Sequence, residues 1–281
     1  MPLHHHPLTI QQHRDPTGAW FPAADTHAPA TLQLICFSYA GGTPSVFRDW
    51  QRQLGDGVQV VPVLLPGRGL RLREPPYTDM GPLAADAATA LVEFGLTPDF
   101  ALFGHSMGAL LAYEVACELR RRGHREPRHL FVSGSRAPHL YGTRQDHTLS
   151  DDDLRRLVHD LGGLGDDHVT ARSYLDRRLP VLRADLRVCE TYRWTPRRPL
   201  RCPMTAFSGT DDPIATAAGT EAWRECTTGS LLRRHLPGDH FFLTGASRLR
   251  LLRELRGELD RLRPDQEART LTARRTPSWT H

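Results

Sequence analysis

The sequence contains no lysine, because all 36 of its basic residues are arginine. It also lacks any apolar run of the roughly 20 residues that a membrane-spanning helix needs, so we expect no insertion into a membrane. Its first residues show no basic segment followed by an apolar stretch, which argues against a secretory signal. The absence of a membrane-spanning run and of a secretory signal predicts a cytoplasmic protein.

Cysteine is scarce and poorly placed for pairing. The five cysteines are odd in number, widely separated and never arranged as C-x-x-C. This pattern argues against both a disulfide framework and a zinc site, so we expect reduced, buried thiols and no bound metal. The formal net charge is +4, but no nucleic-acid-binding motif accompanies it, and we expect no nucleic-acid partner.

Length and composition suit one folded domain. A chain of 281 residues, 39% of them hydrophobic, can bury one large core, and single α/β domains commonly reach this size. Both ends are polar, contain proline and show no periodicity. We therefore expect a flexible N-terminal extension at 1–17, one domain at 18–263 and a flexible C-terminal tail at 264–281.

Between these ends, short apolar runs alternate with longer segments of helical character. The longer segments predict helices at 82–95 and 107–122, and a final helix that stops before Pro264. Alternating strands and helices predict an α/β fold whose mostly parallel sheet is covered by helices on both faces. The expected strands are 32–37, 58–65, 100–104, 129–134, 204–209 and 230–236.

Residues 146–195 interrupt this alternation because they carry helical signals alone. Ser150 and Asp153 form a capping-box pattern before an apolar periodicity, and a second helix is expected at about 174–193. Helices inserted between two strands of a regular sheet form a cap over the strand ends, where such sheets bind their ligands. We therefore expect a helical lid.

The sequence GHSMG at residues 104–108 has the form G-x-S-x-G. An expected strand leads into Ser106 and an apolar helical segment leads out, which is the strand, sharp turn and helix of a nucleophile elbow. The flanking glycines leave room for the turn. A chance serine between two glycines is the alternative, but these surroundings favour Ser106 as a nucleophile.

A serine hydroxyl needs an oriented imidazole to take its proton, and a carboxylate to fix that imidazole. In this fold the order along the chain is Ser, acid, His. Among the late histidines, His235 falls within an expected strand and His281 in the tail, which leaves His240 in PGDHFFL. The acid is expected in SGTDDPIA, where Asp211 and Asp212 are both candidates, although an aspartate before proline can simply form a turn.

Two backbone N–H groups must also bind the oxyanion of the tetrahedral intermediate. One belongs to Met107, the residue after the nucleophile, and the other is expected in the loop after an early strand. The segment SYAGG at 38–42 follows the strand 32–37, with Ala40 as the expected donor. Alternatively, its two glycines form no more than a turn.

These residues together resemble the type II thioesterases, the discrete α/β-hydrolases associated with polyketide and nonribosomal peptide synthesis. The resemblance spans roughly residues 18–262, and it is carried in the family's order by CFSYAGG (36–42), LPGRGLRLREPP (65–76), FGHSMGALLAYEVA (103–116), LPVLRADLRVCETY (179–192), SGTDDP (208–213) and GDHFFL (238–243). In this family the triad acid directly precedes proline, so the resemblance implies the triad Ser106, Asp212 and His240. Two residues depart from the family pattern, since Ser38 replaces a proline and Leu70 an acidic residue.

The resemblance implies that the protein removes acyl groups from the phosphopantetheine arms of acyl or peptidyl carrier proteins, as an editing enzyme without a cofactor and as a monomer. Two other functions stay open. One is a hydrolase of the same fold that acts on a free small-molecule ester or thioester, against which the L-P-G-R-G and L-R-A-D segments count. The other is a non-catalytic binding protein, which the complete triad disfavours.

The expected lid raises two further questions. Because carrier proteins are usually acidic, arginines near the lid could dock them, although we favour a role in surface solubility for Arg177, Arg178 and Arg183. The apolar positions of the first lid helix could select the acyl chain, although we expect packed core at Leu154, Leu157 and Leu161.

Overall fold

The computed structural model describes residues 19–22, 24, 32–162 and 175–262. Within them, six strands form one sheet in the order β2-β1-β3-β4-β5-β6, and every neighbouring pair is parallel. The predicted α/β fold is therefore confirmed. The strands are β1 (Leu32–Phe37), β2 (Val58–Pro62), β3 (Phe100–His105), β4 (His129–Ser133), β5 (Met204–Gly209) and β6 (Leu231–Leu236).

The strands lie where the apolar runs predicted them, with one larger difference. We expected the second strand to reach residue 65, but β2 ends at Pro62. The N–H of Val63 still donates to Cys36 of β1, whereas the N–H of Leu64 donates to the carbonyl of Trp20. The apolar run continues past the strand because this segment stays buried after it has left the sheet.

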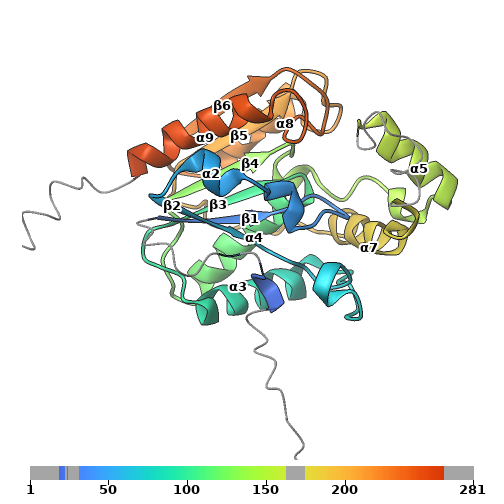
Figure 1. Ribbon diagram of the computed structural model, residues 1–281, viewed down its shortest axis with the longest axis horizontal. Coiled ribbons are helices and arrows are strands. Elements are labelled where there is room, and N and C mark those ends of the chain that lie inside the picture. The colour runs from blue at the N-terminus through green and yellow to red at the C-terminus, as the bar shows by residue number, and fades with distance from the viewer. Residues whose placement is uncertain (1–18, 23, 25–31, 163–174, 263–281) are drawn as a thin grey trace, which may run out of the picture.

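Helices cover both faces of the sheet (Figure 1). Side chains alternate along β1, so that Ile35 and Phe37 pack on one face, and Leu34 and Cys36 on the other. Helices α3 (Met80–Phe94) and α4 (Met107–Arg121) cover the first face, and α2 (Trp50–Leu54) and α9 (Arg248–Leu262) the second. The sheet is thus the middle of three layers.

Helices α3 and α4 begin and end within two residues of their predicted limits, 82–95 and 107–122. Helix α3 starts two residues before the expected position, because the carboxylate of Asp79 accepts the N–H of Gly81 at 2.8 Å and caps the helix. The short helices were not predicted from the sequence. These are α2, α8 (Ala217–Glu221) and the 3-10 helices η1 (Pro44–Phe47), η2 (Gly69–Arg71), η3 (Pro138–Leu140), η4 (Asp146–Thr148) and η5 (Ala222–Cys226).

The region of the expected lid contains η4, α5 (Asp151–Asp160) and α7 (Leu179–Glu190). Ser150 caps α5 as predicted, since its hydroxyl oxygen accepts the N–H of Asp153 at 3.2 Å. Helix α7 is shorter than the expected 174–193, and residues 163–174, where that helix was expected to begin, lie outside the described part of the chain. The predicted extensions at 1–17 and 264–281 also lie outside it.

In the part of the chain that the structure describes, no helix combines the length and the apolar character needed to cross a bilayer. Four of the five cysteines are buried, as expected, and Cys189 is half-buried.

Candidate active site

Ser106 lies at the sharp turn between β3 and α4. Its backbone has φ 55° and ψ −119°, a strained conformation for a residue other than glycine and one that is concentrated at active sites. A Cβ atom on Gly104 would collide with the carbonyl group of Gly108, and one on Gly108 with the carbonyl oxygen of Phe37. The two glycines therefore allow the turn and press the start of α4 against the end of β1.

His240 lies between Ser106 and Asp212. With a proton on Nδ1, its ring donates to Oδ2 of Asp212 at 2.9 Å, and its Nε2 accepts from the Ser106 hydroxyl at 3.0 Å. Asp212 and His240 are both buried. Asp211, the other candidate acid, is exposed and accepts a hydrogen bond from Thr210. Of the two aspartates, Asp212 is the one that contacts His240.

The carboxyl group of Asp212 is held in its ionised form. Burial alone raises its pKa, but the hydrogen bond and charge of His240 and the N–H groups of Ile214 and Ala215 outweigh burial, so the pKa is lowered. Both N–H groups donate to Oδ1, at 2.8 and 3.2 Å, which leaves Oδ2 for His240. Asp212 can therefore orient the imidazole as an anion.

His105, the residue before the predicted nucleophile, binds the backbone of His240. Its Nε2–H donates to the backbone carbonyl of His240 at 2.9 Å, and its Nδ1 accepts from the Ser133 hydroxyl at 2.9 Å. Complete burial, together with the nearby His240, lowers the pKa of His105 to about 3. We did not assign this residue a role from the sequence, although it is the x of G-x-S.

The segment SYAGG forms a turn in which the N–H of Gly42 donates to the carbonyl of Tyr39 at 2.8 Å. Gly41 has φ +74°, the value that the third position of a type II turn requires. Among the described residues, none accepts a hydrogen bond from the N–H of Ala40. Met107 is the first residue of α4, so its N–H has no partner within the helix. Ala40 lines the same pocket as Ser106, and the role of the two N–H groups as oxyanion donors stays a prediction.

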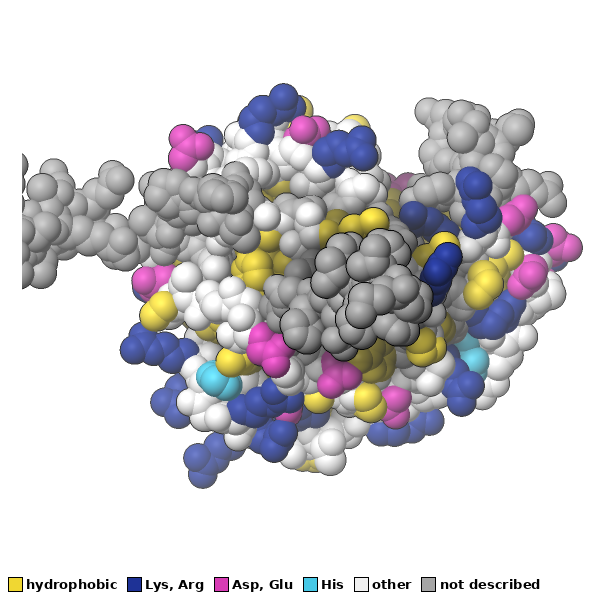
Figure 2. Space-filling model, turned by 60° about the horizontal axis from the view of Figure 1, so that its bottom comes forward, with side chains coloured by type: hydrophobic (Ala, Val, Ile, Leu, Met, Phe, Trp, Pro, Cys, Tyr) yellow, Lys and Arg dark blue, Asp and Glu magenta, His cyan; other side chains and the backbone are white. Residues whose placement is uncertain are grey.

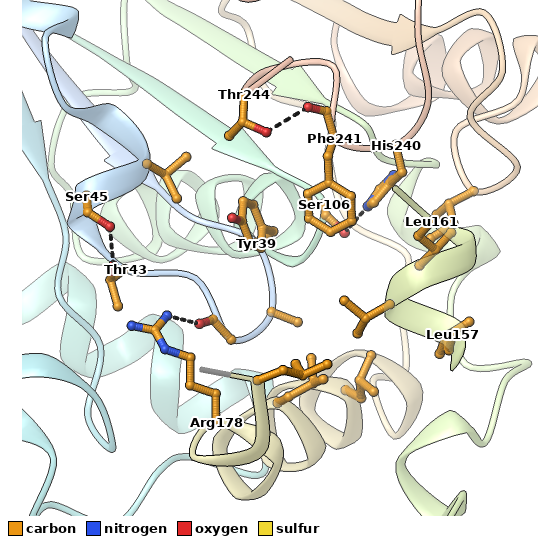
Figure 3. Close-up of a pocket in the computed structure, with 18 residues that line it drawn as sticks. Tyr39, Thr43, Ser45, Ser106, Leu157, Leu161, Arg178, His240, Phe241 and Thr244 are labelled. Carbon is orange, nitrogen blue, oxygen red and sulfur yellow. Dashed lines mark hydrogen bonds between the residues drawn. The ribbon is translucent and has the colours of Figure 1, made fainter. Parts of the chain in front are cut away.

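Ser106 and His240 border a pocket of about 440 Å³, a size common for small-molecule sites. In Figure 3, the leucines of α5 lie on one side of Ser106, and Thr43, Ser45 and Arg178 on the other. The pocket therefore has an apolar end and a polar end. The aliphatic side chains that line the pocket include Leu157, Val158, Leu161, Leu175, Leu182, Leu186 and Ile214.

One expectation for the first lid helix is wrong in part. Leu154 is fully buried, as expected of packed core, but Leu157 and Leu161 line the pocket. Helical periodicity identifies the apolar face of α5 but does not tell whether that face meets protein or a hollow. Here it meets both.

The three arginines considered for docking differ in their surroundings. Arg178 donates to the carbonyl of Gly41 at 3.0 Å, and Arg183 donates to two carbonyls of the lid and to Asp151. Arg177 is exposed. Figure 2 shows arginine and acidic side chains interspersed on the face it presents rather than gathered by sign. Two of the three arginines therefore hold the lid region together.

Three residues of the quoted motifs have contacts that we did not predict. Arg68 of L-P-G-R-G and Asp185 of L-R-A-D form a buried ion pair beside the turn that carries Ala40. Glu190 of E-x-Y accepts the N–H groups of Asp146 and His147 at 2.9 Å and so ties η4 to the end of α7. In the described ranges, no group of three or more His, Cys, Asp or Glu side chains could hold a metal ion.

Comparison with known proteins assigns the chain to a family. The thioesterase domain model matches residues 32–259. RedJ, a thioesterase of the prodiginine biosynthetic pathway of Streptomyces coelicolor, is 68% identical, and the match covers 82% of this chain and 91% of RedJ with a TM-score of 0.80. BorB, the type II thioesterase of the borrelidin biosynthetic cluster, is 33% identical over 85% of this chain and 94% of its own, with a TM-score of 0.75.

A curated relative carries the name of a different activity. The linear gramicidin dehydrogenase LgrE of Brevibacillus parabrevis is 40% identical over 228 residues, which are 80% of this chain and 86% of LgrE. The present sequence contains no G-x-G-x-x-G fingerprint of dinucleotide binding. The activity in the name of LgrE is that of LgrE and is not carried over to this chain.

Proposed function

Because the chain belongs to the thioesterase domain family, we propose that it removes acyl groups from the phosphopantetheine arms of acyl or peptidyl carrier proteins. It is a thioesterase of the α/β-hydrolase fold, and its relatives include the type II thioesterase BorB. The observation that carries the proposal is the unbroken contact from Asp212 through His240 to Ser106 at the border of a largely apolar pocket.

In the proposed reaction, the Ser106 oxygen attacks the thioester carbonyl while its proton passes to Nε2 of His240. The carboxylate of Asp212 stabilises the imidazolium that forms, and the N–H groups of Ala40 and Met107 bind the oxyanion. The thiol, with an ordinary pKa of about 8.5, leaves with the proton of His240. His240 then activates the water that hydrolyses the acyl-enzyme, so that every step uses protein groups and water.

The two ends of the pocket suggest how the substrate lies. Transfer of a hydrocarbon chain from water to an apolar surface is favourable, so we place the acyl group among the leucines of α5 and α7. The phosphopantetheine arm carries two amides, one hydroxyl and a phosphate, so we place it along Thr43, Ser45 and Arg178. Ser106 then lies where the acyl group meets the sulfur.

The experiment that tests this function measures hydrolysis of an acyl group loaded on a phosphopantetheinylated carrier protein, beside the same acyl group on pantetheine. We expect faster release from the carrier and no turnover by Ser106→Ala. Equal rates on both substrates would favour the alternative, a hydrolase of free small thioesters or esters. Undiminished turnover by Ser106→Ala would contradict the proposed nucleophile, whereas a wild-type protein without turnover on either substrate would favour the binding scaffold.

Docking of the carrier is part of the proposal. A net charge of +4 favours an acidic partner, since complementary charge speeds encounter. Screening shortens from about 10 Å at 0.1 M salt to about 3 Å at 1 M. We therefore expect kcat/KM for the carrier-bound substrate to fall several-fold over this range, whereas that for acyl-pantetheine stays constant. A parallel response of both substrates would contradict charge-assisted docking.

We assign the reaction to the cytoplasm. All five cysteines are free in the structure, and unpaired thiols are typical of proteins from reducing compartments.

A further inference from the structure

Arg68 and Asp185 take no part in the chemistry proposed above, yet both are almost fully buried. Arg68 lies in the loop after β2, and Asp185 lies on α7, 117 residues further along the chain. The guanidinium donates to both carboxylate oxygens, each at 2.7 Å, which is the bidentate geometry of a strong pair.

The pair holds the backbone of the turn that carries Ala40. Oδ2 of Asp185 accepts the N–H of Gly41 at 2.7 Å, and Nη1 of Arg68 donates to the carbonyl of Gly42 at 3.2 Å. Arg68 also donates from Nε to the carbonyl of Pro66, so its position is fixed by its own loop. The Ala40–Gly41 and Gly42–Thr43 peptide groups are thus each bound by one member of the pair.

Residues of α7 and of its N-terminal end bind both the N–H and the carbonyl of Gly41. Asp185 of α7 binds the N–H. Arg178, the residue before the first turn of the helix, donates to the Gly41 carbonyl at 3.0 Å, the bond drawn from Arg178 in Figure 3. The side chain of Leu182, one turn before Asp185, packs over the same glycine. The conformation of the turn therefore depends on where the lid helix lies.

Burying two charges is costly, and an apolar pair of similar volume often stabilises a fold as well or better. Stability alone is therefore a weak reason for this pair. An oxyanion donor, in contrast, acts only if its N–H points at the position that the oxygen reaches in the transition state.

We propose that Asp185, held by Arg68, is a positioning residue that aims the N–H of Ala40 at the oxyanion and ties that aim to the lid helix. The inference rests on the proposed function, because it takes Ala40 as an oxyanion donor. It gives the L-P-G-R-G and L-R-A-D motifs one shared role, which is to join the loop after β2, the turn after β1 and α7 at a single point.

The test compares two double variants that both lack the buried charges. Arg68→Met with Asp185→Leu has no acceptor for the N–H of Gly41, whereas Arg68→Met with Asp185→Asn keeps a carbonyl oxygen there. Both are expected to fold, because neither leaves an unpaired charge inside the protein. Asp151→Asn is the matched control. It removes an exposed carboxylate that pairs with Arg183 of α7.

Hydrolysis of decanoyl-pantetheine is measured per folded protein, together with inhibition by a decyl trifluoromethyl ketone, which adds to Ser106 and forms an oxyanion. We expect the Met/Leu variant to lose about 10²-fold in kcat, as for removal of one oxyanion donor, with little change in KM. The inhibition constant should rise by the factor that kcat/KM loses. The Met/Asn variant should recover most of both losses, and Asp151→Asn should match wild type.

Three outcomes would overturn the inference. The two double variants could be equally active, the loss could appear in KM without weaker inhibition, or Asp151→Asn could lose as much as the Met/Leu variant. Failure of the proposed function is distinguishable, because wild type would then show no Ser106-dependent hydrolysis, and the inference would fall with it.

Discussion

At the scale of single residues, the site consists of side chains that each follow a strand of the sheet. Ser106 follows β3, Asp212 follows β5 and His240 follows β6. Because all strands are parallel, their carboxyl ends meet at one edge, and residues far apart in sequence come into contact there. Ser106 and His240, which are 134 positions apart in sequence, are therefore brought together by the topology of the sheet and not by a local motif.

The neighbouring aspartates offer a matched pair of substitutions. In Asp212→Asn, the amide oxygen can still accept the N–H groups of Ile214 and Ala215, so the NH₂ group faces Nδ1 of His240 and imposes the wrong tautomer. We expect kcat/KM to fall about 10⁴-fold, the loss known for the equivalent change in serine proteases. Asp211→Asn should stay within about twofold of wild type, because this residue is exposed. Steady-state kinetics on an acyl-pantetheine would contradict this assignment if Asp211→Asn were the impaired variant.

The sequence alone could assign the candidate site residues where the signal was local. Ser106 and Met107 follow from one pentapeptide and its flanking strand and helix, and His240 follows from its place after the last strand. The choice between Asp211 and Asp212 came from family resemblance, since both lie in the same loop just before Pro213. Arg68 and Asp185 stayed without a role because no local pattern indicates that side chains 117 residues apart will pair and bind the backbone of the same turn.

At the scale of elements, α5 has a double task. One part of its apolar face packs into the protein through Leu154, and another lines the pocket through Leu157 and Leu161. The polar remainder carries arginines such as Arg156, whose side chain is 74% exposed and pairs with Asp153. The strands were predictable to within a few residues, because burial extends over whole apolar runs. The inner face of the lid was not, because a pocket-lining leucine and a core leucine look alike in sequence.

Substitutions on α5 should change which acyl chains are accepted. We expect Leu157→Trp to fill part of the apolar end, so that kcat/KM for decanoyl-pantetheine falls at least about tenfold relative to propionyl-pantetheine, the effect of displacing a few methylenes. Arg156→Trp places the same side chain on the solvent face of the helix and should leave this ratio unchanged. An unchanged ratio in Leu157→Trp would show that the acyl chain does not lie against α5.

At the scale of the whole molecule, two buried histidines link stability to pH. Burial lowers the pKa of His105 to about 3, with a further contribution from His240, and lowers that of His129 to about 4. In the unfolded chain both have pKa values of about 6.5. Above pH 6.5 neither state is protonated, so the native state keeps its full stability. Below it, the unfolded chain takes up protons that the native protein refuses, and stability falls until the folded pKa values are reached.

We therefore expect the free energy of unfolding to drop between pH 7 and pH 5 by about 2 kcal/mol for each of the two histidines. Urea unfolding at pH 5, 6 and 7 measures the drop. His105→Gln and His129→Gln should each remove their own share of the pH dependence, even if they also lower stability at pH 7. His159→Gln, at an exposed position, should leave it intact. A wild-type protein equally stable at pH 5 and pH 7 would contradict the prediction.

The backbone of Ser106 has a consequence for how such a protein evolves. A strained residue of this kind costs about 1–3 kcal/mol. The whole fold of a natural domain is typically stable by only about 5–15 kcal/mol. The turn that holds Ser106 thus uses a sizeable share of the tolerance to mutation. Glycine at this position would adopt the same backbone without that cost, so a serine here lowers stability for the sake of its hydroxyl.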